Sequence, residues 1–124
     1  MRILIAIGSG SFIGAVSRYL LSQLIHTKLT REFPWGTLIV NIVGCFLIGL
    51  IFGLSDRANL SQEWRLFLAT GLLGGFTTYS AFSYETMSML REGQFWYASA
   101  YIFASIVVGL IATFIGIILI ENIV

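Results

Sequence analysis

The sequence predicts an all-α membrane protein of four transmembrane helices, forming one four-span domain over residues 1–124. Apolar residues make up 57% of the chain and charged residues only 10%, whereas soluble domains carry about 25% charged residues. The mean hydropathy is +0.90. So few charges cannot cover a surface in water, so we expect a multi-pass membrane protein surrounded by lipid.

The same composition excludes several classes of function. Seven basic against six acidic residues give a net charge of +1, too little for a nucleic-acid binder that neutralises phosphates. One cysteine excludes an intrachain disulfide framework, and one histidine excludes a multi-histidine metal site. The spans hold no carboxylate pair and no nucleophile beside a base, so we expect no enzymatic activity.

Four apolar runs reach the roughly 20 residues that a membrane-spanning helix needs: residues 3–25, 35–54, 66–90 and 95–120. The first run contains one charge, Arg18, and is too long for the apolar part of a signal peptide. The second and fourth contain no charge. The third has hydroxyl residues in its middle and Glu85 near its end. Polar connectors over residues 26–34, 55–65 and 91–94 separate the runs.

Basic residues are balanced between the two sides of the predicted membrane, although Lys/Arg asymmetry normally sets orientation. Three lie on the side of the N-terminus and three on the other: Arg2, Arg57 and Arg65 against Lys28, Arg31 and Arg91. One interpretation is weak orientation with a single topology still dominant. The other is dual topology, in which oppositely inserted copies form an antiparallel homodimer.

Small residues recur four apart in the spans, a spacing that lets helix backbones approach closely. The pairs are Gly10 with Gly14, Gly49 with Gly53, and Ala112 with Gly116. The sequence leaves open whether they pack within one subunit or between subunits.

The third span has the densest polar pattern. Gly74 and Gly75 precede a hydroxyl cluster that includes Thr77, Thr78 and Ser80, and the centre of the span is Thr78. Two adjacent glycines cost a continuous helix about 1 kcal/mol each relative to alanine. We therefore expect the third helix to be broken near the bilayer midplane, where freed backbone groups can bind an ion. A close helix crossing is the alternative.

Other polar and aromatic residues in the spans are candidates for lining a pore. Asn41 is either a pore donor or a polar contact between helices. Tyr79 and Phe82 are three apart and share a helix face; their electropositive ring edges can face an anion, although simple packing is the commoner role. Tyr101 and Ser105 begin a stripe on the fourth span that is either a polar track or a packing seam.

These residues resemble a known family. The run from Gly74 to Glu85, GGFTTYSAFSYE, resembles the third-helix signature of the Fluc (CrcB) fluoride channels, and WGTLIVN at Trp35–Asn41 with Gly44 resembles its second-helix motif. Gly14-Ala15 with Arg18-Tyr19 resembles the first-helix pattern. The resemblance covers essentially the whole chain. One departure is Tyr79, where the family usually has phenylalanine.

The resemblance implies a multi-pass protein of the bacterial inner (cell) membrane. It implies a dual-topology homodimer with two antiparallel pores for passive fluoride export, which lowers cytoplasmic fluoride and its toxicity. It implies a structural, untransported sodium ion at the dimer centre, bound by backbone carbonyls of Gly74 and Thr77. The implied pore and fluoride-binding residues are Asn41, Thr78, Tyr79, Ser80, Phe82, Tyr101 and Ser105. Arg18 resembles an arginine near a pore mouth, or vestibule.

Two other functions compete with a channel. A small multidrug-resistance type exporter is also short, four-span and capable of dual topology, but its proton coupling needs a carboxylate in the first span, and residues 3–25 contain none. An accessory membrane subunit would show no transport activity of its own.

Overall fold

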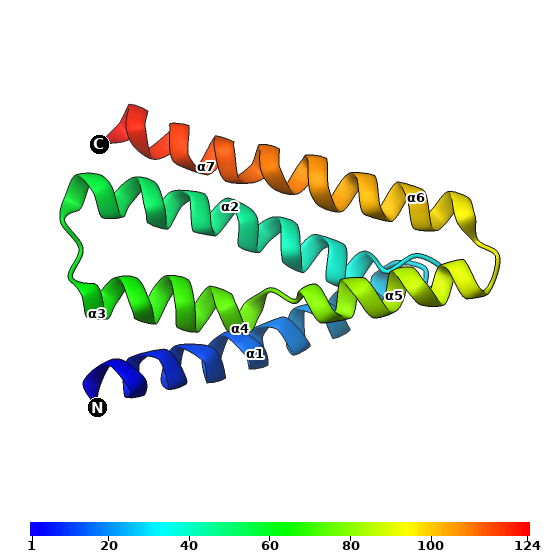
Figure 1. The fold of residues 1–124 in the computed structure, drawn as a ribbon, viewed down its shortest axis with the longest axis horizontal. Helices are drawn as coiled ribbons and strands as arrows, with labels where there is room; N and C mark the ends of the chain where they lie inside the picture. The colour runs from blue at the N-terminus through cyan, green and yellow to red at the C-terminus, as the bar shows by residue number, and fades with distance from the viewer.

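The computed structural model describes all 124 residues, and the chain forms four helical rods (Figure 1). The first two are α1 (Arg2–Lys28) and α2 (Trp35–Ala58). The third is composed of α3 (Gln62–Arg65), η1 (Leu66–Leu73), α4 (Gly74–Phe76) and α5 (Tyr79–Arg91). The fourth runs without a gap through α6 (Phe95–Phe103), η2 (Ala104–Val108) and α7 (Gly109–Ile123). Both termini lie at the same end of the molecule.

Three helices are long and apolar enough to cross a membrane: Arg2–Lys28, Trp35–Ala58 and Phe95–Ile123. The third predicted span, residues 66–90, falls in the rod that is divided into shorter pieces. The architecture is therefore that of an all-helical, multi-pass membrane protein. The η1 and η2 segments have wider turns than an α-helix, a feature that is frequent at functional sites.

The connectors are shorter than the sequence pattern indicated, because the helices continue into polar residues. Helix α1 includes His26 and Lys28, which we had expected in the first connector. Helix α2 ends at Ala58, because the next residue, Asn59, has a left-handed conformation (φ 49°, ψ 50°) that stops the helix. Ser61 caps the start of α3, since its Oγ accepts a hydrogen bond from the Trp64 amide.

The turn between α5 and α6 depends on one glycine. Gly93 has φ 77°, a conformation that costs glycine little. It lets the amides of Gly93 and Gln94 donate to the carbonyls of Leu90 and Met89, at 3.1 and 2.8 Å. The tight turn brings α6 back alongside α5 (Figure 1).

Glycines hold α1 against the third rod. A Cβ added to Gly10 would lie 2.8 Å from the Leu72 amide nitrogen, and one on Gly71 would lie 2.8 Å from the Ile7 carbonyl oxygen. A Cβ on Gly14 would overlap the Leu72 carbonyl. The Gly10–Gly14 pair therefore packs inside one chain.

A second glycine contact joins α2 to α7. A Cβ on Gly116 would lie 2.9 Å from the Leu50 amide nitrogen, and one on Gly53 would lie 3.1 Å from Ile120 Cβ. Gly49 meets the Thr113 carbonyl and Gly116 Cα. Gly49, Gly53 and Gly116 therefore pack within one chain.

We expect Gly14→Val to destabilise the protein by about 3 kcal/mol, because the added side chain must displace backbone rather than a flexible side chain. Gly8→Val is the matched control on the same helix, since a Cβ at Gly8 has no neighbour within 4 Å. Thermal unfolding of both variants in detergent measures the difference. Equal loss of stability in the two variants would contradict the assigned contact.

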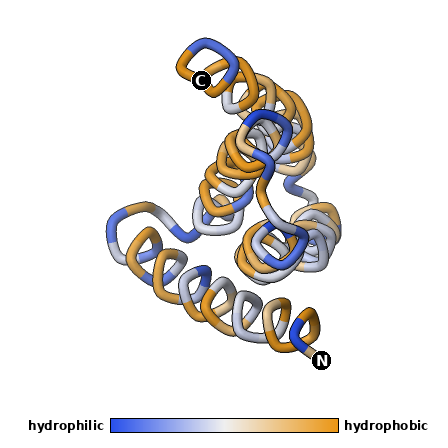
Figure 2. The backbone as a smooth tube through the Cα atoms, turned by 90° about the vertical axis from the view of Figure 1, so that its left-hand side faces the viewer, coloured by the Kyte–Doolittle hydropathy of each residue, from blue (hydrophilic) through white to orange (hydrophobic).

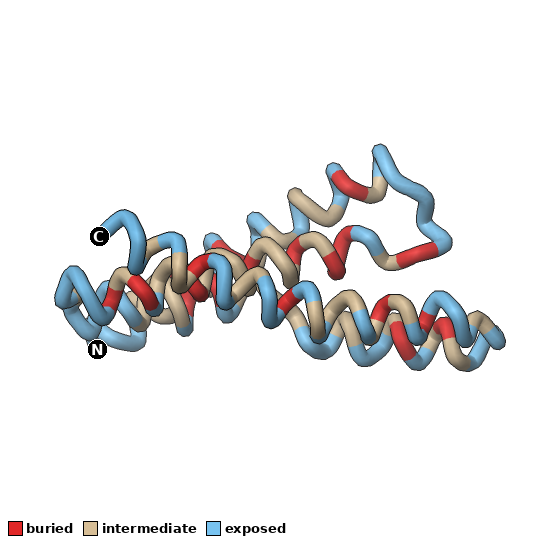
Figure 3. The backbone as a smooth tube through the Cα atoms, turned by 90° about the horizontal axis from the view of Figure 1, so that it is seen from above, coloured by how far each residue is buried: buried red, intermediate tan, exposed pale blue.

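Much of the apolar surface is uncovered. Only 21 of 124 residues are buried, and the accessible surface is 7964 Å². A soluble protein of this mass (13.7 kDa) would expose roughly 6,600 Å². Apolar residues lie all round the long helices, and buried positions are few (Figures 2 and 3). The outward apolar side chains need lipid or another protein chain as neighbours.

Candidate functional site

The third rod is interrupted at two residues. Helix α4 ends at Phe76 and α5 begins at Tyr79; between them Thr77 (φ −89°, ψ 158°) and Thr78 (φ −149°, ψ 114°) are extended. Extended residues remove backbone hydrogen bonds that a continuous helix would make. The freed groups must find other partners.

The two glycines are not the extended residues. Gly74 and Gly75 are helical and form the start of α4. A Cβ on Gly75 would lie 3.0 Å from Ser11 Cα and 3.1 Å from the Ala15 amide nitrogen. Gly75 thus serves a close helix crossing, the alternative considered for the pair, and the chain leaves the helix two residues later.

Asn41 of α2 holds the interruption open. Its Nδ2 donates to the Thr78 carbonyl (3.0 Å), and its Oδ1 accepts from the Thr78 amide (2.8 Å). In a continuous helix that amide would donate to the Gly74 carbonyl. Because Asn41 takes the donor, the Gly74 carbonyl loses its ordinary helical partner.

The Thr77 carbonyl loses its partner in a similar way. Its helical donor would be the Ala81 amide, but that amide donates to Thr78 Oγ1 (3.2 Å). The Thr77 hydroxyl points back along the rod and donates to the Leu73 carbonyl (2.9 Å). Ser80 lies beside this cap, with its Oγ 3.2 Å from Thr78 Oγ1.

Arg18 of α1 binds the backbone just before the interruption. Its Nε donates to the Gly75 carbonyl at 3.1 Å, whose helical donor would have been the Tyr79 amide across the gap. Arg18 therefore supplies a partner for one of the freed carbonyls. Four carbonyls lose their helical donor at the interruption: those of Gly74, Gly75, Phe76 and Thr77. Only the Gly75 carbonyl receives another donor, from Arg18.

A cavity of about 260 Å³ lies beside the interruption, and eight residues line it: Asn41, Cys45, Thr77, Thr78, Tyr79, Phe82, Ser105 and Ile106. Six of these are residues that the sequence singled out, and they come from α2, the interruption, α5 and η2. Ser105 Oγ is buried without a hydrogen-bond partner. The Tyr79 and Phe82 rings have centroids 5.7 Å apart and planes tilted by 43°.

The cavity is weakly polar and has no charged residue in its lining. Asn41 Nδ2 carries two protons, one of which is given to Thr78. The other proton, the Ser105 hydroxyl and the aromatic ring edges are all weak donors. Such a set can replace part of the hydration shell of a small anion without binding it tightly.

Tyr101 lies outside this lining. It is fully buried, and its hydroxyl donates to Glu85 Oε2 at 2.7 Å, while Thr37 Oγ1 donates to Glu85 Oε1 at 2.7 Å. The sequence pattern placed Glu85 near the end of the third apolar run and assigned no role in the pore to Glu85 or to Thr37.

A pattern in the sequence could have indicated this cluster. Thr37 is four residues before Asn41, and Tyr101 is four before Ser105, so each shares a helix face with a residue of the cavity. Glu85 is three residues after Phe82 and shares its face in the same way. The cluster is therefore one helix turn away from the cavity on all three helices.

No group of three or more His, Cys, Asp or Glu side chains is placed to hold a metal ion. The oxygens at this site are neutral ones, from the backbone and from hydroxyl and amide side chains. The carbonyls of Gly74, Phe76 and Thr77 have lost their helical donors and are available ligands.

Comparison with known proteins gives one family. Residues 5–117 match the family model described as "CrcB-like protein, Camphor Resistance (CrcB)". A Geobacter sulfurreducens protein named fluoride-specific ion channel FluC is 48% identical, over 94% of this chain and 95% of its own length. Proteins of the same name from Thermus thermophilus and Pyrococcus horikoshii are each 47% identical, over 92% and 94% of this chain and 90% and 92% of their own lengths.

Proposed function

The chain belongs to the CrcB family, a family of membrane transport proteins and not of enzymes, and from this premise we propose that it is a fluoride-selective ion channel. Fluoride leaves the cytoplasm through it passively, which lowers the toxicity of the ion. The observation that carries the proposal is the uncharged, weakly donating cavity at the interruption of the third rod. The names of the relatives agree with it.

Conduction needs sites that are favourable enough for fluoride to enter and weak enough for it to leave. Asn41, Ser105 and the edges of Tyr79 and Phe82 supply several weak donors around one cavity. Fluoride is small and strongly hydrated, so it gains more than larger halides from close contact with hydrogen-bond donors. A fixed positive charge in the cavity would hold the ion too long.

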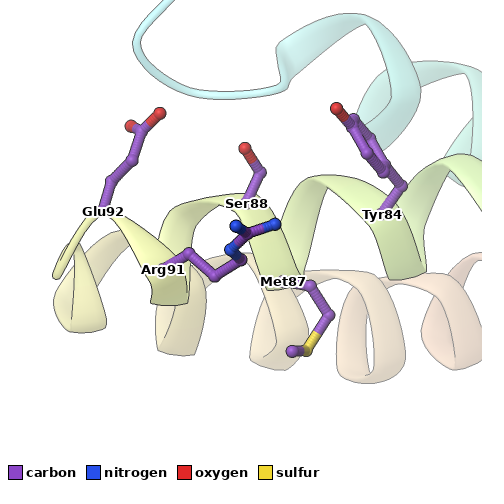
Figure 4. A pocket seen from close by; sticks show the side chains of 5 residues that line it. All are labelled: Tyr84, Met87, Ser88, Arg91 and Glu92. Atoms are coloured by element: carbon purple, nitrogen blue, oxygen red, sulfur yellow. The ribbon is translucent and has the colours of Figure 1, made fainter.

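We also propose that two copies assemble as an antiparallel, dual-topology homodimer with two pores. The extent of uncovered apolar surface supports this, and so does the Tyr79 side chain, which is 81% exposed although it lines the cavity. The outer face of α5 also lacks a neighbour: a hollow of about 420 Å³ is lined only by Tyr84, Met87, Ser88, Arg91 and Glu92 (Figure 4). The partner copy would complete the pore wall.

We further propose that the interruption lies at the membrane midplane and holds a structural sodium ion between the two copies. The Gly74 and Thr77 carbonyls, whose helical donors are taken by Asn41 and Thr78, support this. Neutral carbonyl oxygens are hard ligands that suit a hard cation. Two carbonyls from each copy would give four ligands around a two-fold axis.

Dual topology predicts that a tag on the C-terminus is accessible from both sides of the membrane in intact cells and spheroplasts. The physical reason is the balance of three basic residues against three at the two sides. Labelling with a membrane-impermeant reagent measures the two fractions, which we expect to be about equal. A tag that is labelled from one side only would contradict dual topology.

The function itself is tested by loading liposomes that contain the purified protein with fluoride or with chloride and following efflux with ion-selective electrodes. We expect rapid fluoride efflux and chloride efflux no faster than from protein-free liposomes. An accessory subunit predicts no efflux of either ion. A proton-coupled exporter is not favoured, because α1 contains no acidic residue.

A further inference from the structure

We propose that Glu85 is a positioning residue of the pore, which acts through Tyr101 to set the orientation of the Phe82 ring. The inference deepens the proposed channel function and rests on it. The Glu85 carboxylate on α5 accepts one hydrogen bond from α2 and one from α6, through Thr37 and Tyr101, both at 2.7 Å. One side chain thus ties together the three helices that surround the cavity.

The hydroxyl protons of Thr37 and Tyr101 determine whether Tyr101 can donate a hydrogen bond to an anion. A hydroxyl has a single proton, and Thr37 and Tyr101 both give theirs to Glu85. The Tyr101 oxygen can then offer only lone pairs, which repel an anion. Since Tyr101 is also fully buried, it acts as a positioning residue and not as the fluoride donor that the sequence pattern suggested.

The connection to the pore runs through aromatic contacts. The Tyr101 ring lies between Phe33, at a centroid distance of 5.6 Å and 78°, and Phe82, at 5.1 Å and 56°. Phe82 in turn contacts Tyr79, at 5.7 Å. Fixing the Tyr101 hydroxyl to Glu85 holds its ring in place, and a closely packed ring leaves Phe82 only one well-packed orientation.

Two substitutions remove this arrangement with little change in volume. Glu85→Gln keeps the shape but replaces one acceptor oxygen by a donor group, which cannot accept the hydroxyl proton. Tyr101→Phe removes only the hydroxyl and keeps the ring. Tyr97→Phe is the matched control, because Tyr97 is one turn earlier on α6 and its hydroxyl makes no hydrogen bond in the structure.

The direct test is a fluorine NMR spectrum of protein that carries 4-fluorophenylalanine at position 82. We expect the Phe82 resonance to shift or broaden in Glu85→Gln and in Tyr101→Phe, and to stay in place in Tyr97→Phe. If both variants leave the resonance unchanged, the positioning role is wrong. Should Glu85→Gln fail to assemble, Tyr101→Phe alone decides, since it leaves the packed ring in place.

Fluoride efflux gives the second readout. Loss of the hydrogen bond between Tyr101 and Glu85 should slow fluoride efflux about tenfold in Glu85→Gln and in Tyr101→Phe. The double variant should be no slower than the slower of the two single variants. A direct fluoride donor at Tyr101 predicts the opposite for Glu85→Gln, which would free the hydroxyl proton and leave flux equal or faster. That result would overturn the inference.

The two readouts separate this inference from the proposed function. A wild-type protein that passes no fluoride refutes the channel, while the NMR response of Phe82 still tests the positioning. A wild-type protein that conducts fluoride, with a Phe82 resonance indifferent to both substitutions, refutes the positioning alone.

Discussion

Asn41→Ala is expected to slow fluoride efflux by about a hundredfold, because one side chain makes both hydrogen bonds that hold Thr78 out of the helix. Without them the Thr78 amide can return to the Gly74 carbonyl and the helix can close through the interruption. The variant then loses a pore donor and a freed carbonyl together. Fluoride efflux from liposomes measures the loss.

Cys45→Ala is the matched control for Asn41→Ala. Cys45 lies one turn further along α2 and lines the same cavity, but its side chain makes no hydrogen bond that holds the interruption. We expect fluoride efflux within about threefold of wild type, the size of effect of a small packing change. An Asn41→Ala variant that is as fast as Cys45→Ala would return Asn41 to the role of a simple contact between helices.

Replacing sodium by a bulky organic cation on both sides of the membrane is expected to abolish fluoride efflux. The Gly74 and Thr77 carbonyls of two copies would face one another without a cation, and their partial negative charges would repel at the centre of the dimer. We therefore expect the dimer contact to weaken as flux is lost. Efflux and chemical cross-linking after prolonged dialysis measure both effects.

Two results would contradict the proposed role of sodium. Full fluoride efflux after long incubation without sodium would show that the carbonyls need no cation. Sodium moving together with fluoride would show that the cation is transported instead of structural. Potassium in place of sodium is the control for ionic strength. When either cation is added back to sodium-free protein, we expect sodium to restore fluoride efflux better than the larger potassium ion.

The helices could be predicted from the sequence because the free energy of moving a helix from water into lipid depends on the composition of about 20 consecutive residues. Their ends were less predictable: His26 and Lys28 are polar, yet they remain helical because α1 has nothing to stop it before Leu29. The glycine pairs predicted close approach of helices correctly. They did not reveal their partners, since the Leu72 carbonyl that Gly14 meets comes from a distant part of the chain.

The site was only partly predictable for a similar reason. The hydroxyl cluster located the interruption to within a few residues, but Thr77 and Thr78 are extended and the glycines are not. The partners of the two charges inside the spans depend on tertiary structure. Arg18 binds Gly75, 57 residues away, and Glu85 binds Thr37, 48 residues away; local spacing contains no information on such pairs.

The central claim is passive conduction of fluoride through this chain, and a voltage measurement tests it most directly. Purified protein in a planar bilayer is exposed to a tenfold gradient of fluoride, with chloride, sodium and pH equal on both sides. We predict that the voltage of zero current moves by about 59 mV, the value for a tenfold gradient of a singly charged ion. A tenfold gradient of chloride alone should leave it at zero. A zero-current voltage that ignores fluoride, or that follows chloride or pH, would contradict the account.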